Sequence, residues 1–339
     1  MKPIVLSAPW PRTLDLIFSA EHRDALHSHY EVVETDEQAL PNLGAETLAN
    51  TRYILGQPSL SEQTLERMTE LRAVLNVESN LIDNMPYARL FGRGIHVLTT
   101  GAVFAVPVAE LGLGLALDLA RGITDADLAF RQGKEAWGGE GNANARLLTG
   151  ATVGLIGYGD LGKALHRVLA GFRCRFVVHD PWLPASFMRD EGLEPMALHD
   201  IAACADVVFV VAAVTNENRH FLDRKFFDAM TSGSLFILLS RADVVDFAAL
   251  TDVVSAGKIR AASDVFPQEP LPPSDPLRCL PGFIRSAHRA GALDVAFKGM
   301  GEMVLEDMQL MDAGLPPMRC KRAERETAAR MQSRPVENN

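Results

Sequence analysis

Short apolar runs alternate with longer amphipathic segments along most of the chain, and this rhythm restricts the possible folds more than any other feature. Alternating strand and helix patterns are typical of parallel sheets covered by helices on both faces. The sequence therefore predicts an α/β protein with two doubly wound sheets. The expected strands cover residues 4–7, 30–33, 53–55, 73–76 and 96–98 in a first series, and 153–156, 176–179, 207–211, 235–239 and 260–263 in a second.

Chain length favours two domains, because 339 residues exceed the size at which a single core usually stops growing. An apolar segment at 103–121 has helical spacing, and Gly112 and Gly114 would let another backbone come close to it. We expect this helix to join the two domains. A long helix at 293–311 would return the chain to the first domain, and the charged tail from Arg319 is expected to form a short helix.

The two series of elements then define a discontinuous arrangement. Residues 1–102 together with 297–339 form one smaller domain, and residues 103–296 are inserted into it as the other.

Charge and cysteine usage argue against several classes of protein. The net charge is −10 and no basic stripe is present, so neither a nucleic acid nor an anionic membrane is an expected partner. The four cysteines are far apart and form no CxxC pair, which predicts neither a disulfide framework nor a metal site. The first 18 residues are broken by prolines, and the apolar stretch 108–120 is too short to cross a bilayer. We expect a cytoplasmic protein.

A glycine motif opens the second series. Gly157, Gly159 and Gly162, in the order GYGDLG, follow an expected strand and precede a helical pattern at 163–169. In a dinucleotide site the first glycine permits a tight turn, the second lets the backbone approach the pyrophosphate, and the third lets the helix pack on the strand. The amides of the helix N-terminus then hold the phosphates. Within this loop, Asp160 must point outward and Leu161 would line the cofactor.

An acidic residue stands where such a motif requires one. Asp180 closes the run 176–179, about 20 residues after the glycines, and a carboxylate there accepts the ribose hydroxyls and repels a 2′-phosphate. NAD is therefore the expected cofactor, bound by a Rossmann domain. The alternative interpretation is a glycine turn in another α/β protein, with Asp180 as the N-cap of a helix that begins at Pro181.

Three further motifs follow in the second series: SRADVVD at 240–246, DVFPQEP at 264–270 and SAHRAG at 286–291. Reduction of a 2-oxo acid requires a cation for the carboxylate and a group that protonates the new alkoxide, for which histidine is suited. In order and spacing these motifs resemble the signatures of the D-isomer-specific 2-hydroxyacid dehydrogenases. The resemblance implies a Rossmann NAD-binding domain inserted into a smaller flavodoxin-like substrate domain.

The resemblance also implies roles for single residues. Arg241 would bind the substrate carboxylate and carbonyl oxygen, His288 would be the general acid and base, and Glu269 would orient the ring and favour its protonated form. Asp264 would meet the nicotinamide carboxamide. The backbone around Ser240 would pass beneath the nicotinamide, and the cofactor loop would contain Thr215. Taken one at a time, three of these residues have a structural alternative. Arg241 could form a surface ion pair, Glu269 could be a solvated loop residue, and His288 could cap a helix.

The chain departs from the family pattern at the loop that usually binds the substrate carboxylate through glycine amides. Residues 78–81 read ESNL, so Ser79 and Leu81 stand at positions where glycine is common. We expect Ser79 and Asn80 to supply hydrogen bonds to a substrate of altered shape. Arg289 replaces a small or apolar residue beside His288, and is interpreted as a surface arginine rather than a second anion contact.

The expected function is interconversion of a small 2-oxo acid and its D-2-hydroxy acid by NAD-dependent hydride transfer, without a metal. The apolar segment 103–121 and the family resemblance both suggest a homodimer. An alternative from another class is an NAD(H)-sensing, corepressor-like binding protein of the same fold. Formate or phosphite oxidation on the same fold is a further alternative. Formate is disfavoured, because formate dehydrogenases typically carry glutamine where Glu269 stands.

Overall fold

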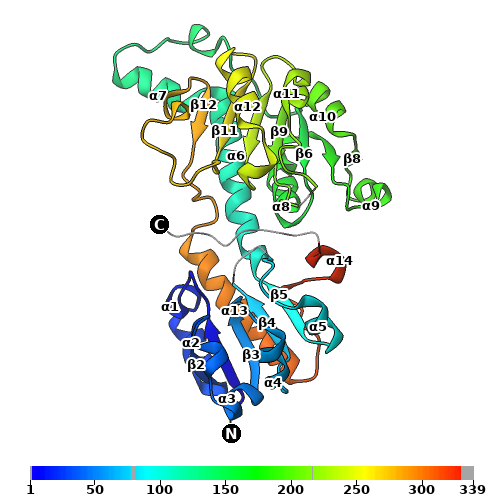
Figure 1. The fold of residues 1–339 in the computed structure, drawn as a ribbon. Coiled ribbons are helices and arrows are strands. Elements are labelled where there is room, and N and C mark those ends of the chain that lie inside the picture. The colour runs from blue at the N-terminus through cyan, green and yellow to red at the C-terminus, as the bar shows by residue number, and fades with distance from the viewer. Residues whose placement is uncertain (1, 78–80, 216, 330–339) are drawn as a thin grey trace. The chain divides into compact units, whose positions relative to one another are not determined.

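The computed structural model describes residues 2–77, 81–215 and 217–329 (Figure 1). The chain divides into two compact units. Unit 1 contains residues 1–103 and 292–339, and unit 2 contains residues 104–291. The sequence placed these boundaries at 102/103 and 296/297. The division of roles between the units, cofactor in one and substrate in the other, is taken up below as part of the proposed function.

Unit 1 has a six-stranded sheet in the order β13-β5-β4-β3-β1-β2. All pairs are parallel except β13 with β5, in which Lys321 lies opposite Thr99. The order 2-1-3-4-5 of its first five strands is that of the flavodoxin fold, as expected. The strands are β1 Ile4–Ala8, β2 Glu31–Glu34, β3 Thr51–Gly56, β4 Ala73–Asn76, β5 His96–Thr99 and β13 Lys321–Arg322.

The tail after Arg319 differs from the prediction. It pairs first as the short edge strand β13, and only then forms a helical turn, α14 Arg325–Ala328. The buried carboxylate of Asp307 explains this path, because it accepts hydrogen bonds from the backbone N–H groups of Met318 at 2.7 Å, Arg319 at 2.9 Å and Cys320 at 2.8 Å. These bonds fix the chain just before the strand.

Unit 2 has a seven-stranded parallel sheet in the order β12-β11-β10-β9-β6-β7-β8. Counted from β6, this is the Rossmann order 3-2-1-4-5-6 with one more strand, and it confirms the expected doubly wound fold. The strands are β6 Thr152–Ile156, β7 Arg175–His179, β8 Glu194–Pro195, β9 Val207–Val210, β10 Leu235–Leu238, β11 Arg260–Ser263 and β12 Phe283–Arg285.

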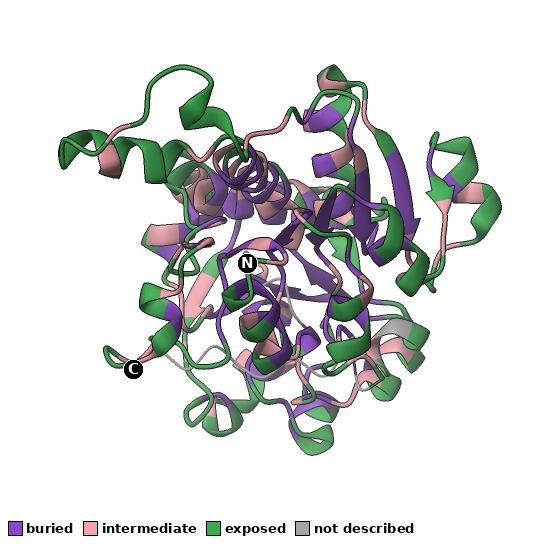
Figure 2. Cartoon of the chain, turned by 90° about the horizontal axis from the view of Figure 1, so that it is seen from above, coloured by how far each residue is buried: buried purple, intermediate pink, exposed green. Residues whose placement is uncertain are grey.

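Central strands of unit 2 are buried on both faces, and strands are drawn mostly as buried in Figure 2. Val153 and Leu155 contribute to the core on the side of α6 and α8, whereas Val208 and Val210 contribute to the core on the side of α10 to α12. Alternate side chains of a strand point to opposite faces, so an uncharged apolar run satisfies both.

The helices of unit 1 are α1 Leu14–Ile17, α2 Ala20–His29, α3 Ala45–Ala49, α4 Glu62–Arg67, α5 Tyr87–Gly92, α13 Asp294–Asp312 and the α14 named above. Those of unit 2 are α6 Ala105–Arg121, α7 Ile123–Arg131, α8 Asp160–Leu169, α9 Ala185–Asp190, α10 Leu198–Cys204, α11 Arg224–Ala229 and α12 Phe247–Ser255.

Helix α6 is the apolar segment that the sequence singled out. A β-carbon at Gly112 would lie 2.5 Å from Leu239 and 3.3 Å from Leu165, so glycine there allows close packing, whereas nothing lies within 4 Å at Gly114. With the preceding 3₁₀ turn the helix spans Gly101–Arg121, which by length and composition alone is enough to cross a membrane. It packs in the core of unit 2 against α8 and β10. A cytoplasmic location stays a prediction.

Candidate active site

The glycine motif forms the loop between β6 and α8. Gly157 has φ of +95°, and a β-carbon there would lie 2.7 Å from the backbone nitrogen of Ala212. A β-carbon at Gly162 would lie 2.6 Å from the carbonyl oxygen of Gly157. At Gly159 nothing lies within 4 Å. The first and third glycines are therefore required by the chain itself, whereas the second faces open space.

Asp180 follows β7 and joins two loops at the same edge of the sheet. Its Oδ2 accepts a hydrogen bond from the backbone N–H of Tyr158 at 2.8 Å, and its Oδ1 accepts one from the backbone N–H of Trp182 at 3.0 Å. The N-cap of α9 is Pro184, so the alternative interpretation of Asp180 as a helix cap is wrong. Asp160 and Leu161 begin α8 and are both half-buried.

Thr215 lies in the loop after β9. Its backbone N–H donates to Oδ1 of Asn218 at 2.8 Å, and the amide of Asn218 donates to the carbonyl oxygen of Ala213 at 2.7 Å. The loops that follow β6, β7 and β9 thus lie at the carboxyl edge of the sheet, where the strand order reverses. This is the place at which doubly wound sheets bind their ligands.

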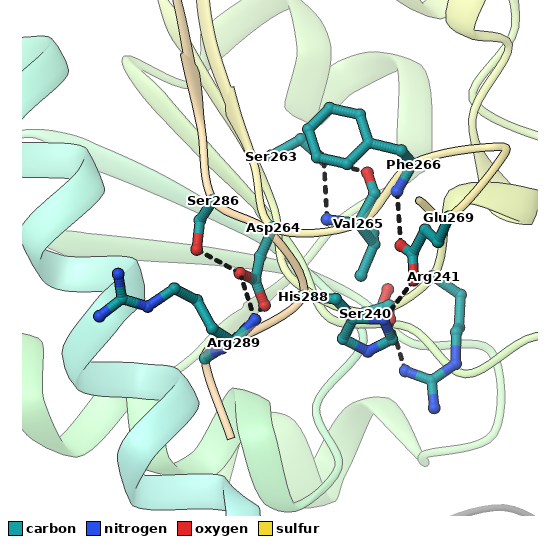
Figure 3. A network of polar contacts seen from close by, with 11 residues as sticks. Ser240, Arg241, Ser263, Asp264, Val265, Phe266, Glu269, Ser286, His288 and Arg289 are labelled. Carbon is teal, nitrogen blue, oxygen red and sulfur yellow. Dashed lines mark hydrogen bonds and ion pairs between the residues drawn. The ribbon is translucent and has the colours of Figure 1, made fainter. Parts of the chain in front are cut away.

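The three later motifs follow three neighbouring strands. Arg241 comes after β10, Glu269 lies in the loop after β11, and His288 comes after β12. Nδ1 of His288 lies 2.5 Å from Oε2 of Glu269, whose Oε1 accepts the backbone N–H of Phe266 at 2.8 Å (Figure 3). Both carboxylate oxygens of Glu269 are therefore engaged, and the imidazole is held through one nitrogen.

The charge of Glu269 is stabilised by this arrangement. Burial alone would raise the pKa of Glu269, but the hydrogen bonds from His288 and the Phe266 N–H, with the positive charges of His288 and Arg241, together lower that pKa below its usual value. The carboxylate is thus kept ionised beside the ring. Arg241 itself donates from Nη1 to the carbonyl oxygen of Ser240 at 2.8 Å.

Asp264 has a role that the sequence did not indicate. Its side chain is buried, and its carboxylate accepts the Ser286 hydroxyl at 2.5 Å and the backbone N–H groups of Arg289 and Ala290, both at 3.0 Å. The backbone N–H of His288 donates to the carbonyl oxygen of Asp264 at 2.7 Å. Asp264 therefore fixes the loop that presents His288. Hydrogen bonds to backbone N–H groups that lie 25 and 26 residues away along the chain leave no pattern in a sequence.

Arg289 is exposed, and its side chain extends away from the ring of His288, on the opposite side from Arg241 (Figure 3). This agrees with its interpretation as a surface arginine. The predicted substrate residues Ser79 and Asn80 lie outside the described residues. At Val77, the last described residue before this gap, the carbonyl oxygen accepts a hydrogen bond from Nε of Arg12 at 3.1 Å, a contact that the sequence did not predict.

These residues fit a nicotinamide dinucleotide. Gly159 leaves space for a pyrophosphate beside the helix N-terminus, and Asp180 stands where a ribose would bind. The hydroxyl of Ser240 is buried and has no hydrogen-bond partner among the described residues, which is unusual unless a ligand supplies one. Within the same part of the chain no three His, Cys, Asp or Glu side chains are grouped so as to hold a metal.

Comparison with known proteins agrees with this site. The sequence model described as "D-isomer specific 2-hydroxyacid dehydrogenase, NAD binding domain" matches residues 113–290. A crystal structure of a phosphoglycerate oxidoreductase from Rhizobium etli is 64% identical, with a TM-score of 0.90, and the match covers 96% of this chain and 100% of that one.

Two curated relatives are more distant. A glyoxylate reductase from Korarchaeum cryptofilum is 31% identical over 240 residues, which cover 69% of this chain and 72% of the relative. A D-3-phosphoglycerate dehydrogenase from Methanocaldococcus jannaschii is 26% identical over 87% of this chain, but the match spans only 56% of that longer protein. With the fold, the cofactor loops and the family match in agreement, the chain belongs to the D-isomer-specific 2-hydroxyacid dehydrogenases, a family of NAD-dependent oxidoreductases.

Proposed function

We propose that this enzyme interconverts a small 2-oxo acid and its D-2-hydroxy acid, with His288 as the general acid and base. The observation that carries the proposal is the pair formed by Nδ1 of His288 and the carboxylate of Glu269 at 2.5 Å. Because Nδ1 is engaged, the proton that passes to the substrate oxygen is the one on Nε2. The ionised carboxylate stabilises the protonated ring that reduction requires.

Arg241 is the proposed substrate cation. It lies in the loop after β10, which pairs with β11, the strand before Glu269. Its charge contributes to the lowered pKa of the Glu269 carboxylate. A guanidinium binds a carboxylate through a planar fork of N–H donors, and it also polarises a neighbouring carbonyl. In the reductive direction it would hold the 2-oxo acid and stabilise the growing negative charge on its oxygen.

NADH supplies the hydride when it is bound. The proposed cofactor residues are those at the carboxyl edge of the unit 2 sheet: Gly157, Gly159, Asp160, Leu161, Gly162, Asp180, Thr215, Ser240, Arg241, Asp264 and His288. Unit 2 would then be the cofactor unit, and unit 1 the substrate unit, with Ser79 and Asn80 as hydrogen-bond donors to the acid.

The experiment is NADH oxidation measured with glyoxylate, hydroxypyruvate, pyruvate, phenylpyruvate and 3-phosphohydroxypyruvate. The names of the relatives include reactions of both a two-carbon acid and a phosphorylated three-carbon acid, so the panel contains both kinds. At least one member should be turned over. In His288→Ala we expect kcat to fall by roughly 10²- to 10⁴-fold with the folded state retained.

The matched control is His27→Ala, because His27 is an exposed histidine of α2. It should leave kcat within about twofold. Full activity in His288→Ala would refute the assignment. Leu81 is 4% exposed and packs in the core of unit 1, so the expectation that it fills substrate space is wrong and it is not part of the test. In a separate test of the loop, Ser79→Gly should change the preference among the acids, and an unchanged preference would remove Ser79 from the substrate site.

A homodimer is the proposed assembly. Helix α7 carries Ile123, Leu128 and Phe130, all more than half exposed, directly after the apolar helix α6. Apolar side chains gathered on one short segment are typical of a protein interface. Light scattering of the wild type should give twice the chain mass. In the double variant Leu128→Asp, Phe130→Asp the measured mass should fall toward that of a single chain. A monomeric wild type would contradict the proposal.

A further inference from the structure

The turn that follows β7 is held by two hydrogen bonds and restricted by two prolines. Asp180, Pro181, Trp182 and Leu183 form a β-turn, in which the backbone N–H of Leu183 donates to the carbonyl oxygen of Asp180 at 3.4 Å. Proline suits the second position of such a turn because its ring fixes φ. The Asp180 side chain adds a second bond, since its Oδ1 accepts the N–H of Trp182 at 3.0 Å. Pro184 directly follows the turn and restricts the backbone there.

This turn presents an indole to solvent. Trp182 occupies the third position of the turn and is 39% exposed. Within the described ranges its ring has neither a hydrogen-bonding nor an aromatic partner, although an indole is the largest apolar surface that a side chain can bury. The turn thus places a partly exposed aromatic residue two positions after the proposed ribose carboxylate.

We propose that Trp182 stacks on the adenine ring of NAD. This inference rests on the proposed assignment of Asp180 to the adenosine ribose. Adenine is joined to that ribose by a single glycosidic bond, so a group two residues along the same tight turn is within reach of the base. Adenine is flat and uncharged, and base–aromatic stacking is a common way for proteins to bind it.

The turn also couples the two contacts. Oδ1 of Asp180 holds the backbone of Trp182, while Oδ2 holds the N–H of Tyr158 in the glycine loop. One carboxylate therefore aligns the pyrophosphate loop and the adenine-binding turn. A backbone held in this way loses little conformational freedom on binding, which favours affinity.

The experiment measures binding of ADP-ribose, which has the adenosine half of NAD and no nicotinamide, by titration calorimetry. We expect Trp182→Ala to weaken ADP-ribose and NADH binding by roughly tenfold each, and Trp182→Phe to restore most of the affinity. Binding of reduced nicotinamide mononucleotide should not change, because it lacks adenine. The matched control is Trp10→Ala, a 77% exposed tryptophan of unit 1, which should leave ADP-ribose binding unchanged.

Fluorescence provides a second readout, because the chain has only three tryptophans. In a variant with Trp10→Phe and Trp137→Phe, all indole emission comes from Trp182. ADP-ribose should quench this emission by direct stacking. If ADP-ribose binds Trp182→Ala as tightly as it binds the wild type, or leaves the emission unchanged, the inference is wrong, and the indole would then serve another surface.

Failure of the underlying ribose assignment would look different. Asp180→Asn should reduce the preference for NADH over NADPH. If that preference is unchanged while Trp182→Ala still weakens ADP-ribose, the ribose role of Asp180 is wrong and the adenine contact stands. If the preference changes and Trp182→Ala has no effect on ADP-ribose binding, the ribose role of Asp180 stands and the adenine contact is wrong.

Discussion

His288 has φ of +48°, a backbone conformation that side-chain-bearing residues rarely adopt. Such a residue costs free energy and persists only where its surroundings fix it. Here the fixing group is Asp264, which is 1% exposed and accepts the N–H groups of Arg289 and Ala290 directly after the histidine. The buried carboxylate therefore stabilises the strained backbone of His288, and this backbone directs the imidazole toward Glu269.

Removing the charge of Glu269 tests this pair by its pH dependence. In Glu269→Gln the protonated ring loses its negative partner, so the pH profile of kcat/KM for 2-oxo acid reduction should decline at lower pH than in the wild type. At neutral pH kcat should fall by about 10- to 100-fold, less than in His288→Ala. An unchanged profile would mean that Glu269 does not act through His288.

Glu269 should also make the free energy of unfolding depend on pH. Because the pKa of Glu269 is lowered in the folded state, its contribution is present above the unfolded pKa of about 4.3 and is lost as pH falls through the lower folded pKa. Urea unfolding should therefore show a difference between wild type and Glu269→Gln that shrinks as the pH falls below about 4. A difference that grows on acidification would contradict the lowered pKa.

At the scale of elements, the loop between β6 and α8 separates folding from binding. A β-carbon at Gly157 would meet backbone atoms of Ala212, and φ of +95° is strained for alanine, whereas Gly159 has open space around it. Gly157→Ala should lower the free energy of unfolding by about 1–3 kcal/mol or more. Gly159→Ala should leave it within about 0.5 kcal/mol and weaken NADH binding instead. Calorimetry and urea unfolding of both variants would separate the effects, and equal destabilisation would contradict this division.

Most strands could be predicted because they contain short apolar runs between turn signals, such as 73–76 and 235–238. The missed strands β8, β12 and β13 have only two or three residues, too few for a periodic pattern, and β13 is charged because it lies at a sheet edge. In the candidate site, motif order indicated the His288 and Glu269 pair. The anchoring role of Asp264 was not predictable, because its partners are mainly backbone N–H groups.

On the scale of the whole molecule, the chain leaves unit 1 and returns to it, so the two units need not share one stability. The proposed cofactor residues all lie between 157 and 288 in unit 2. Unit 1 is closed by its own late elements, α13 and β13, and α13 packs against α1. At Gly301 a β-carbon would lie 2.5 Å from the carbonyl oxygen of Ile17, so this packing is close.

Asp307 allows the independence of the units to be tested. Its carboxylate is fully buried and accepts three backbone N–H groups of the tail, so Asp307→Ala leaves three donors without their acceptor, and that of Cys320 is buried. The loss should be about 3–5 kcal/mol in unit 1. NADH affinity should stay within about twofold of the wild type, because no unit 2 contact is touched. Thermal unfolding should show an early transition that NADH does not raise, followed by one that it does. A single transition raised as a whole by NADH would mean instead that the inserted unit and its host unfold together.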